Sequence, residues 1–113
     1  MATYDNLPVY KDSYDLLLNI FIFSVEIKKE YKYTLGESLK KETVAMITDI
    51  YRANSTLADR KEKIQSARET LEVIRLFLRL LKDLKQISLP KFVAINELME
   101  SISKQLTAWK NQS

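Results

Sequence analysis

The sequence contains no cysteine and no histidine, and it has only one glycine and two prolines in 113 residues. Without cysteine, neither a disulfide framework nor a thiolate metal site can form. Without histidine, the commonest general base and the commonest transition-metal ligand are both missing. Because β-sheets need turns, and turns depend on glycine and proline, this composition predicts long helices joined by few connections.

The motifs of common enzyme classes are also missing. The chain has no glycine-rich phosphate loop, no histidine-containing metal motif and no nucleophile–base pair. Glu69 with Glu72, or Glu97 with Glu100, could face one another as carboxylate pairs, but di-iron bundles also require Glu-x-x-His. Surface carboxylates are the simpler interpretation. We therefore predict that the chain is not an enzyme and needs no metal or other cofactor.

Length and composition predict one domain covering residues 1–113, since 46% of the residues are hydrophobic and 29% are charged. The first fifteen residues include Asp5, Asp12 and Asp15, where a signal peptide would be basic. The most apolar run, residues 16–23, is shorter than the ~20 residues that cross a bilayer. We expect a cytoplasmic protein with no membrane partner.

The first helix is predicted over residues 12–31, after an extended leader over residues 1–11. Pro8 disfavours helix in the residue before it, which is why we expect the leader to be extended. The apolar residues of this helix cover more than one stripe. One face has Tyr14, Leu17, Phe21, Ser24 and Ile27, and Leu16, Ile20 and Phe23 widen it.

The second helix is predicted to begin at Thr34 and to end near Arg52. Thr34 and Glu37 have the spacing of a capping box, in which each side chain accepts a backbone N–H of the other residue. Ser55 is a candidate N-cap for the helix that follows. The positions expected to be buried are Leu35, Leu39, Thr43, Met46, Ile47 and Ile50.

The third and fourth helices show the clearest periodicity, with apolar residues spaced alternately by three and four. Ser88 as a cap and Pro90 in the first turn separate the two helices. The seams are Ile64, Ala67, Leu71, Ile74, Leu78 and Leu81, then Phe92, Ile95, Met99, Ile102, Leu106 and Trp109. Short connections between long amphipathic helices predict an all-α fold, an antiparallel up-down-up-down four-helix bundle.

The third helix also has a second apolar group on an adjoining arc, consisting of Val73, Leu76, Phe77, Leu80 and Leu84. In one interpretation this helix is central and neighbours of the same chain cover both arcs. In the other, one arc packs the bundle and the second contacts another subunit. The first helix likewise has more apolar residues than one buried stripe requires, and this favours a homo-oligomer.

A narrow basic stripe remains on the third helix. Arg68, Arg75, Arg79 and Lys82 project within about 60° of one another at ideal helical angles. Such a stripe could follow a phosphate backbone, because arginine presents a planar fork of donors. Alternatively it is a solvated face, with Glu72 paired to Arg68 or Arg75.

Several segments resemble a known family. They are Leu7-Pro8-Val9-Tyr10-Lys11, Tyr14-Asp15-Leu16-Leu17, Tyr33-Thr34-Leu35-Gly36, the run from Leu71 to Leu84, Gln105-Leu106 and Trp109-Lys110. The opening is similar to four-helix-bundle proteins related to the 23S ribosomal intervening-sequence protein. The later segments resemble one branch of that group, the accessory variability determinants of diversity-generating retroelements.

The resemblance implies a barrel-shaped homopentamer of four-helix bundles with a basic surface. It further implies nucleic-acid binding and association with the retroelement's reverse transcriptase while template RNA is copied into mutagenised cDNA. Arg75 and Arg79 match the paired arginines of the family's helix. The predicted nucleic-acid-binding residues are Arg68, Arg75, Arg79, Lys82, Lys40 and Lys41. The alternative is a structural or adaptor bundle of the intervening-sequence type with no specific nucleic-acid role.

Overall fold

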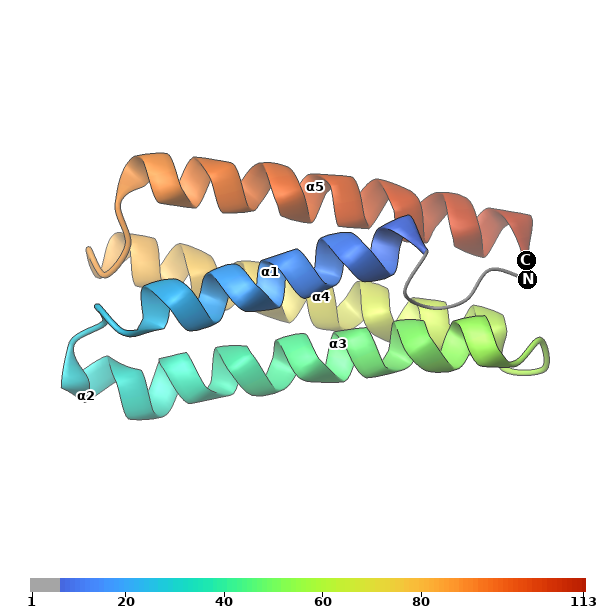
Figure 1. Cartoon of the computed structure of the whole chain (residues 1–113), viewed down its shortest axis with the longest axis horizontal. Coiled ribbons are helices and arrows are strands. Elements are labelled where there is room, and N and C mark those ends of the chain that lie inside the picture. Colours follow the sequence, from blue (N-terminus) through green and yellow to red (C-terminus); the bar gives the residue numbers. More distant parts are fainter. Residues whose placement is uncertain (1–6) are drawn as a thin grey trace.

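Four long helices run alternately in opposite directions, which confirms the predicted up-down-up-down bundle (Figure 1). This computed structural model describes residues 7–113, and none of them is in a β-strand. The elements in chain order are α1 (Pro8–Ser24), α2 (Lys29–Tyr31), the π-helical turn η2 (Lys32–Gly36), α3 (Glu37–Ser55), α4 (Arg60–Asp83) and α5 (Leu89–Gln112).

The four long helices stand at the corners of an elongated bundle of 42 × 23 × 21 Å. Both α1 and α4 pack against α3 and α5. As a result α1 lies diagonally opposite α4, and α3 lies diagonally opposite α5. The outer surfaces of α1 and α4 therefore face away from each other.

The two predicted seams supply half of the buried hydrophobic core. All six seam residues of α4 are buried. On α5 the inner four seam positions, from Ile95 to Leu106, are buried, while Phe92 and Trp109 at the ends are partly buried. The seam predictions are thus confirmed, because their alternating spacing keeps the apolar side chains on one face of each helix.

The first helix differs from its predicted limits at both ends. It begins at Pro8, so the prediction of an extended leader is wrong for residues 8–11, and residues 1–6 lie outside the described residues. Proline is suited to the first helical turn, because a backbone N–H at that position would form no hydrogen bond within the helix. The helix ends at Ser24 instead of near residue 31, and the turn that follows buries Ile27 next to Gly36 of η2.

Two of the three predicted caps are wrong. The Thr34 hydroxyl donates to the carbonyls of Glu30 and Tyr31, both at 3.3 Å, so it belongs to the π-helical turn and caps nothing. Ser55 is the last residue of α3, and its hydroxyl donates to the Tyr51 carbonyl at 3.0 Å. The Ser88 cap is confirmed, since its Oγ accepts the backbone N–H of Lys91 at 3.3 Å.

The apolar arcs of α1 and α4 divide into a buried and an exposed part. On α1 the buried arc contains Leu16, Ile20 and Phe23, whereas Tyr14 and Phe21 are about half exposed. On α4 the second arc leaves Val73, Leu76 and Leu80 exposed. Helices of the same chain therefore do not cover both arcs of α4, and that interpretation is wrong.

Replacing either Leu71 or Leu78 with alanine should lower the free energy of unfolding by ~2–5 kcal/mol, because each substitution leaves a cavity in a fully packed seam. The matched control is Leu57→Ala, since that leucine is exposed and its loss should cost less than ~0.5 kcal/mol. Urea denaturation followed by circular dichroism measures all three. Equal losses for buried and exposed leucines would contradict the assigned core.

Candidate nucleic-acid interface

The predicted basic stripe borders the seam between α4 and α5. Arg75 of α4 donates from a terminal guanidinium nitrogen to Glu100 Oε1 of α5 at 2.6 Å. Further along the stripe, Lys82 Nζ lies 4.9 Å from the centre of the Phe92 ring of α5. The stripe therefore lies beside a neighbouring helix and is not a freely exposed face.

Arg75 is the most constrained member of the stripe. Its side chain is only 22% exposed, and its Nε lies 3.5 Å from Glu72 Oε2 without forming a hydrogen bond. Together with the contact to Glu100, this places two carboxylates around one guanidinium. The predicted pairing of Glu72 with the stripe is confirmed for Arg75. A half-buried cation needs such partners, because removal from water disfavours an isolated charge.

Arg79 has the opposite environment. Its side chain is 76% exposed, and its one ion pair among the described residues is a 4.0 Å contact with Asp83 on the same helix. Lys82 shares that carboxylate, at 3.7 Å, and is more covered. Arg79 is therefore the stripe residue whose guanidinium is most accessible to a phosphate.

Arg68 takes part in a polar cluster that connects α4 to α5. A guanidinium nitrogen of Arg68 donates to Gln65 Oε1 at 3.1 Å, and Lys110 Nζ donates to the same oxygen at 2.6 Å. A shallow hollow of about 160 Å³ beside Arg68 is also lined by Glu69 and Glu72. Acids and cations are mixed there, so the hollow is not strongly selective for an anion.

Lys40 and Lys41 lie on α3, which is diagonally opposite α5. Lys40 is 3.5 Å from Glu37, and its ammonium is 4.5 Å from the centre of the Phe21 ring. Lys41 is exposed and forms no ion pair within residues 7–113. The six predicted residues thus form two separate groups, with four beside the α4–α5 seam and two on α3.

Sequence reasoning missed a group of lysines at one end of the bundle. Lys28 and Lys29 were expected inside the first helix, and the sequence reasoning assigned no role to Lys85. In the structure the backbone N–H of Lys28 donates to Gln86 Oε1 at 2.8 Å, which joins the two connections. The predicted topology could have revealed this group, because the first and third connections of an up-down-up-down bundle lie at the same end.

Residues 7–113 contain no cluster of three or more carboxylates positioned to hold a metal ion. In the same part of the chain, no helix combines the length and the apolar character needed to cross a membrane.

A family model described as bAvd-like matches residues 9–113, which extends from the first turn of α1 to the last residue. Comparison with curated proteins gives no match.

The Arg75–Glu100 pair should contribute more to stability than the Arg79–Asp83 contact. Arg75→Ala should lower the free energy of unfolding by about 1 kcal/mol, whereas Arg79→Ala should change it by less than ~0.5 kcal/mol. A double-mutant cycle with Glu100→Ala should give a coupling of roughly 0.5–1 kcal/mol. Thermal or urea unfolding measures these values. A coupling near zero would show that the pair stabilises nothing.

Proposed function

The chain belongs to the bAvd-like family of bacterial accessory variability determinants, and we propose that it is the non-catalytic accessory subunit of a diversity-generating retroelement. In this role it binds nucleic acid and associates with the retroelement's reverse transcriptase. It supports the copying of template RNA into mutagenised cDNA, in the cytoplasm. The observation behind the proposal is the family match, which covers the entire bundle.

The distribution of charge is compatible with this role. Arg79 and Lys41 are both exposed. Within residues 7–113 Lys41 forms no ion pair, and the ion pair of Arg79 is the 4.0 Å contact with Asp83. Contacts from such side chains to phosphates position a strand without reading its bases. Arg75 fits the structural alternative better, because two carboxylates already surround it. Within the predicted set, we therefore assign phosphate binding to Arg79 and Lys41 ahead of Arg75.

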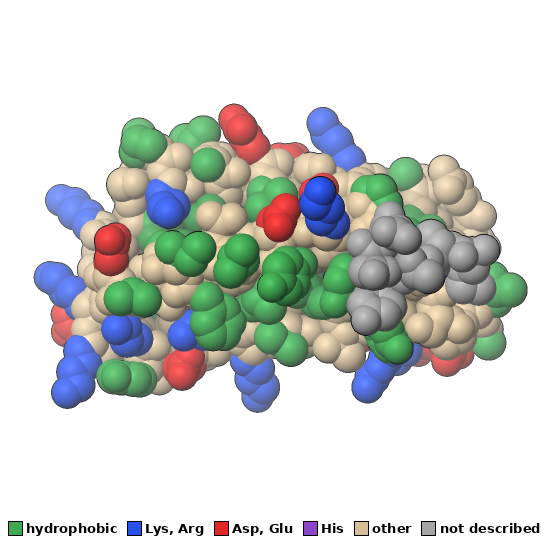
Figure 2. Space-filling model, viewed as in Figure 1, with side chains coloured by type: hydrophobic (Ala, Val, Ile, Leu, Met, Phe, Trp, Pro, Cys, Tyr) green, Lys and Arg blue, Asp and Glu red, His purple; other side chains and the backbone are tan. Residues whose placement is uncertain are grey.

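Self-association is the second part of the proposal. An exposed apolar face runs along α1, formed by Tyr14, Leu18, Phe21 and Ile22. These side chains fall within a 100° arc at ideal helical angles. The middle of the surface on this side of the molecule is correspondingly apolar (Figure 2). A hollow of about 130 Å³, lined by Tyr14, Leu17, Leu18 and Phe21, offers room for a partner's side chain.

A second exposed apolar face, formed by Val73, Leu76 and Leu80, lies on α4. Because α1 and α4 occupy opposite corners, one symmetric dimer contact cannot bury both faces. A head-to-tail contact, in which the α1 face of one copy meets the α4 face of the next, buries both and closes into a ring if the rotation permits. Exposed apolar faces of this kind mark interaction surfaces. We propose such a ring, with five subunits favoured by the family resemblance.

The reverse-transcriptase association can be tested by co-expression. The chain, untagged, is produced with the affinity-tagged reverse transcriptase of a diversity-generating retroelement and purified through the tag. We expect co-purification, and we expect cDNA synthesis on template RNA to require the chain. An unrelated group II intron reverse transcriptase with the same tag is the control. Failure to co-purify, together with cDNA synthesis independent of the chain, would refute the accessory role.

The head-to-tail ring predicts a specific complementation pattern. Ile22→Glu on α1 and Leu76→Glu on α4 should each give a monomer in light scattering, because a buried glutamate opposes either half of the contact. Mixing the two monomers should produce a heterodimer, since each retains one intact half. A symmetric α1–α1 contact would instead leave the Leu76 variant assembled. The control is Leu57→Glu in the exposed α3–α4 loop, which should assemble like the wild-type chain.

A further inference from the structure

The whole net charge of the chain is concentrated at one end of the bundle. Residues 25–32 and 84–91 contain five lysines and two glutamates, whereas the remaining thirteen cations are balanced by thirteen acids. We call these two segments the basic cap. Its lysines are Lys28, Lys29, Lys32, Lys85 and Lys91. Basic side chains gather at the end where Figure 1 places α2, as Figure 2 shows.

The two segments of the basic cap are fixed to each other. Gln86 accepts the backbone N–H of Lys28 at 2.8 Å with Oε1 and donates from Nε2 to the Leu84 carbonyl at 3.0 Å. The backbone N–H of Gln86 also donates to the Leu81 carbonyl at 2.8 Å, which closes the C-terminus of α4. The lysines of the two connections are thus held near one another before any ligand arrives.

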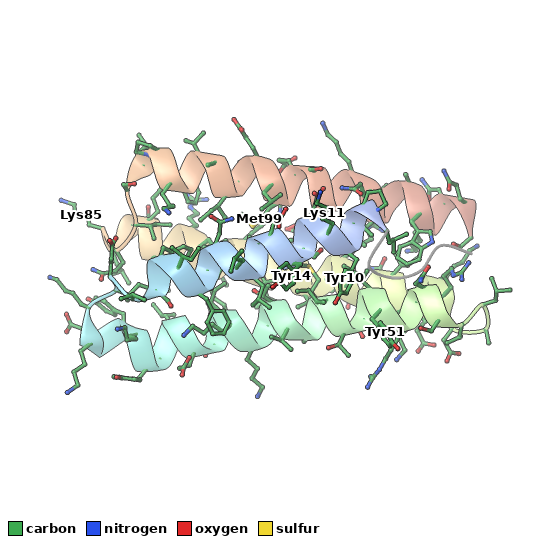
Figure 3. The ribbon with its side chains drawn as sticks, in the orientation of Figure 1. Tyr10, Lys11, Tyr14, Tyr51, Lys85 and Met99 are labelled. Atoms are coloured by element: carbon green, nitrogen blue, oxygen red, sulfur yellow. The ribbon has the colours of Figure 1, made fainter. Side chains whose placement is uncertain are left out.

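Lys85 adopts an unusual backbone conformation at this point. Its φ of 61° is the only positive φ among the non-glycine residues described. Helices commonly end in this left-handed conformation, and glycine adopts it with least strain. Here a lysine occupies the position, so a side chain with a charged end projects from the tip of the connection (Figure 3). Backbone strain of this kind is concentrated at functional sites.

The ammonium groups of the basic cap lack the partners that occupy the α4 stripe. None of its five lysines forms an ion pair within residues 7–113, although Glu26 and Glu30 belong to the same segment. In contrast, Arg75, Arg79 and Lys82 all have a carboxylate within 4.0 Å. An anionic ligand at the cap therefore displaces no ion pair of the described structure.

An exposed aromatic side chain directly follows the first cap segment. Tyr33 of η2 is 65% exposed and is adjacent to Lys32 in the chain. Bases of a single strand stack on aromatic side chains while lysines follow the phosphates, and stacking is sequence-tolerant. In a duplex the bases already stack on one another. A basic surface next to an exposed tyrosine therefore favours a single strand over a duplex.

We propose that the basic cap, with Tyr33, is the site at which this chain binds single-stranded nucleic acid. The proposal rests on the proposed function and locates the principal contact away from the α4 stripe. An anionic bilayer surface is the competing ligand, since Val25 and Leu89 are exposed nearby. Membrane-surface binding usually relies on an amphipathic helix, however, and α2 spans only Lys29–Tyr31.

The test compares two triple variants that remove the same charge from exposed lysines without ion pairs. The cap variant is Lys28→Ala, Lys29→Ala and Lys85→Ala, and the control is Lys11→Ala, Lys61→Ala and Lys104→Ala. Lys85 lies at the tip of the bundle, whereas Lys11 lies near its middle (Figure 3). Fluorescence anisotropy with a labelled single-stranded RNA of about 20 nucleotides, and with its duplex, gives the affinity at several salt concentrations. Melting temperatures confirm that each variant folds.

The cap variant should bind the single strand at least about tenfold more weakly at about 50 mM salt, with the log–log salt slope flattened by roughly 2. The control should stay within about twofold of the wild-type chain. Tyr33→Ala should weaken single-strand binding about fivefold or more without changing the slope, because stacking releases no counterions, and Tyr33→Phe should restore binding.

Several results would overturn the proposal, and they separate it from the proposed function. If the wild-type chain binds RNA but the cap and control variants lose affinity equally, the cap is not the site, and the accessory role stands. The same holds if Arg79→Ala alone removes binding. If the wild-type chain binds only the duplex, the cap proposal fails and the nucleic-acid role stands, whereas both fail if it binds neither. Binding only to phosphatidylserine-containing vesicles, lost in the cap variant, would assign the cap to a lipid surface.

Discussion

Burial of the α4 seam is the constraint on which the rest of the structure depends. Six apolar side chains on one face of a 24-residue helix must be removed from water, and α4 does this by packing against both α3 and α5. This leaves α1 as the cover at the opposite corner, in contact with the same two helices. This packing also determines which residues of α5 lie beside the α4 residues that flank the seam. Arg75 lies where α5 presents Glu100, and Lys82 lies where it presents Phe92.

The same constraint separates two kinds of basic residue. Cations that flank the seam are partly removed from water, and a guanidinium in that position is stabilised by carboxylates, as Arg75 is by Glu72 and Glu100. At the end of the bundle Lys28, Lys29 and Lys85 are exposed to water and need no such partner. The lysines of the basic cap are therefore available to a ligand, although sequence periodicity draws attention to the stripe on α4.

The proposed ring and the proposed cap are geometrically compatible. The apolar faces of α1 and α4 lie on the sides of the bundle, whereas the basic cap lies at one end. In a closed ring of identical subunits, symmetry places every cap on the same rim. A single strand could then contact several caps at once, and such multivalent contact raises the overall affinity without any new type of interaction. The modest net charge of one subunit, +3, would be multiplied around that rim.

The sequence by itself determined the helices and their buried seams, because a spacing of three and four places side chains on one face through local geometry alone. It also determined the Ser88 cap, whose partner is only three residues away. The caps at Thr34 and Ser55 failed because Thr34 lies inside the π-helical turn η2 and Ser55 is still the last residue of α3. Tertiary structure alone decided that α1 ends at Ser24, that Arg75 meets Glu100, and that Lys28 meets Gln86, 58 residues later. Each of these depends on a partner that periodicity cannot identify, because the energy of the contact comes from a segment distant along the chain.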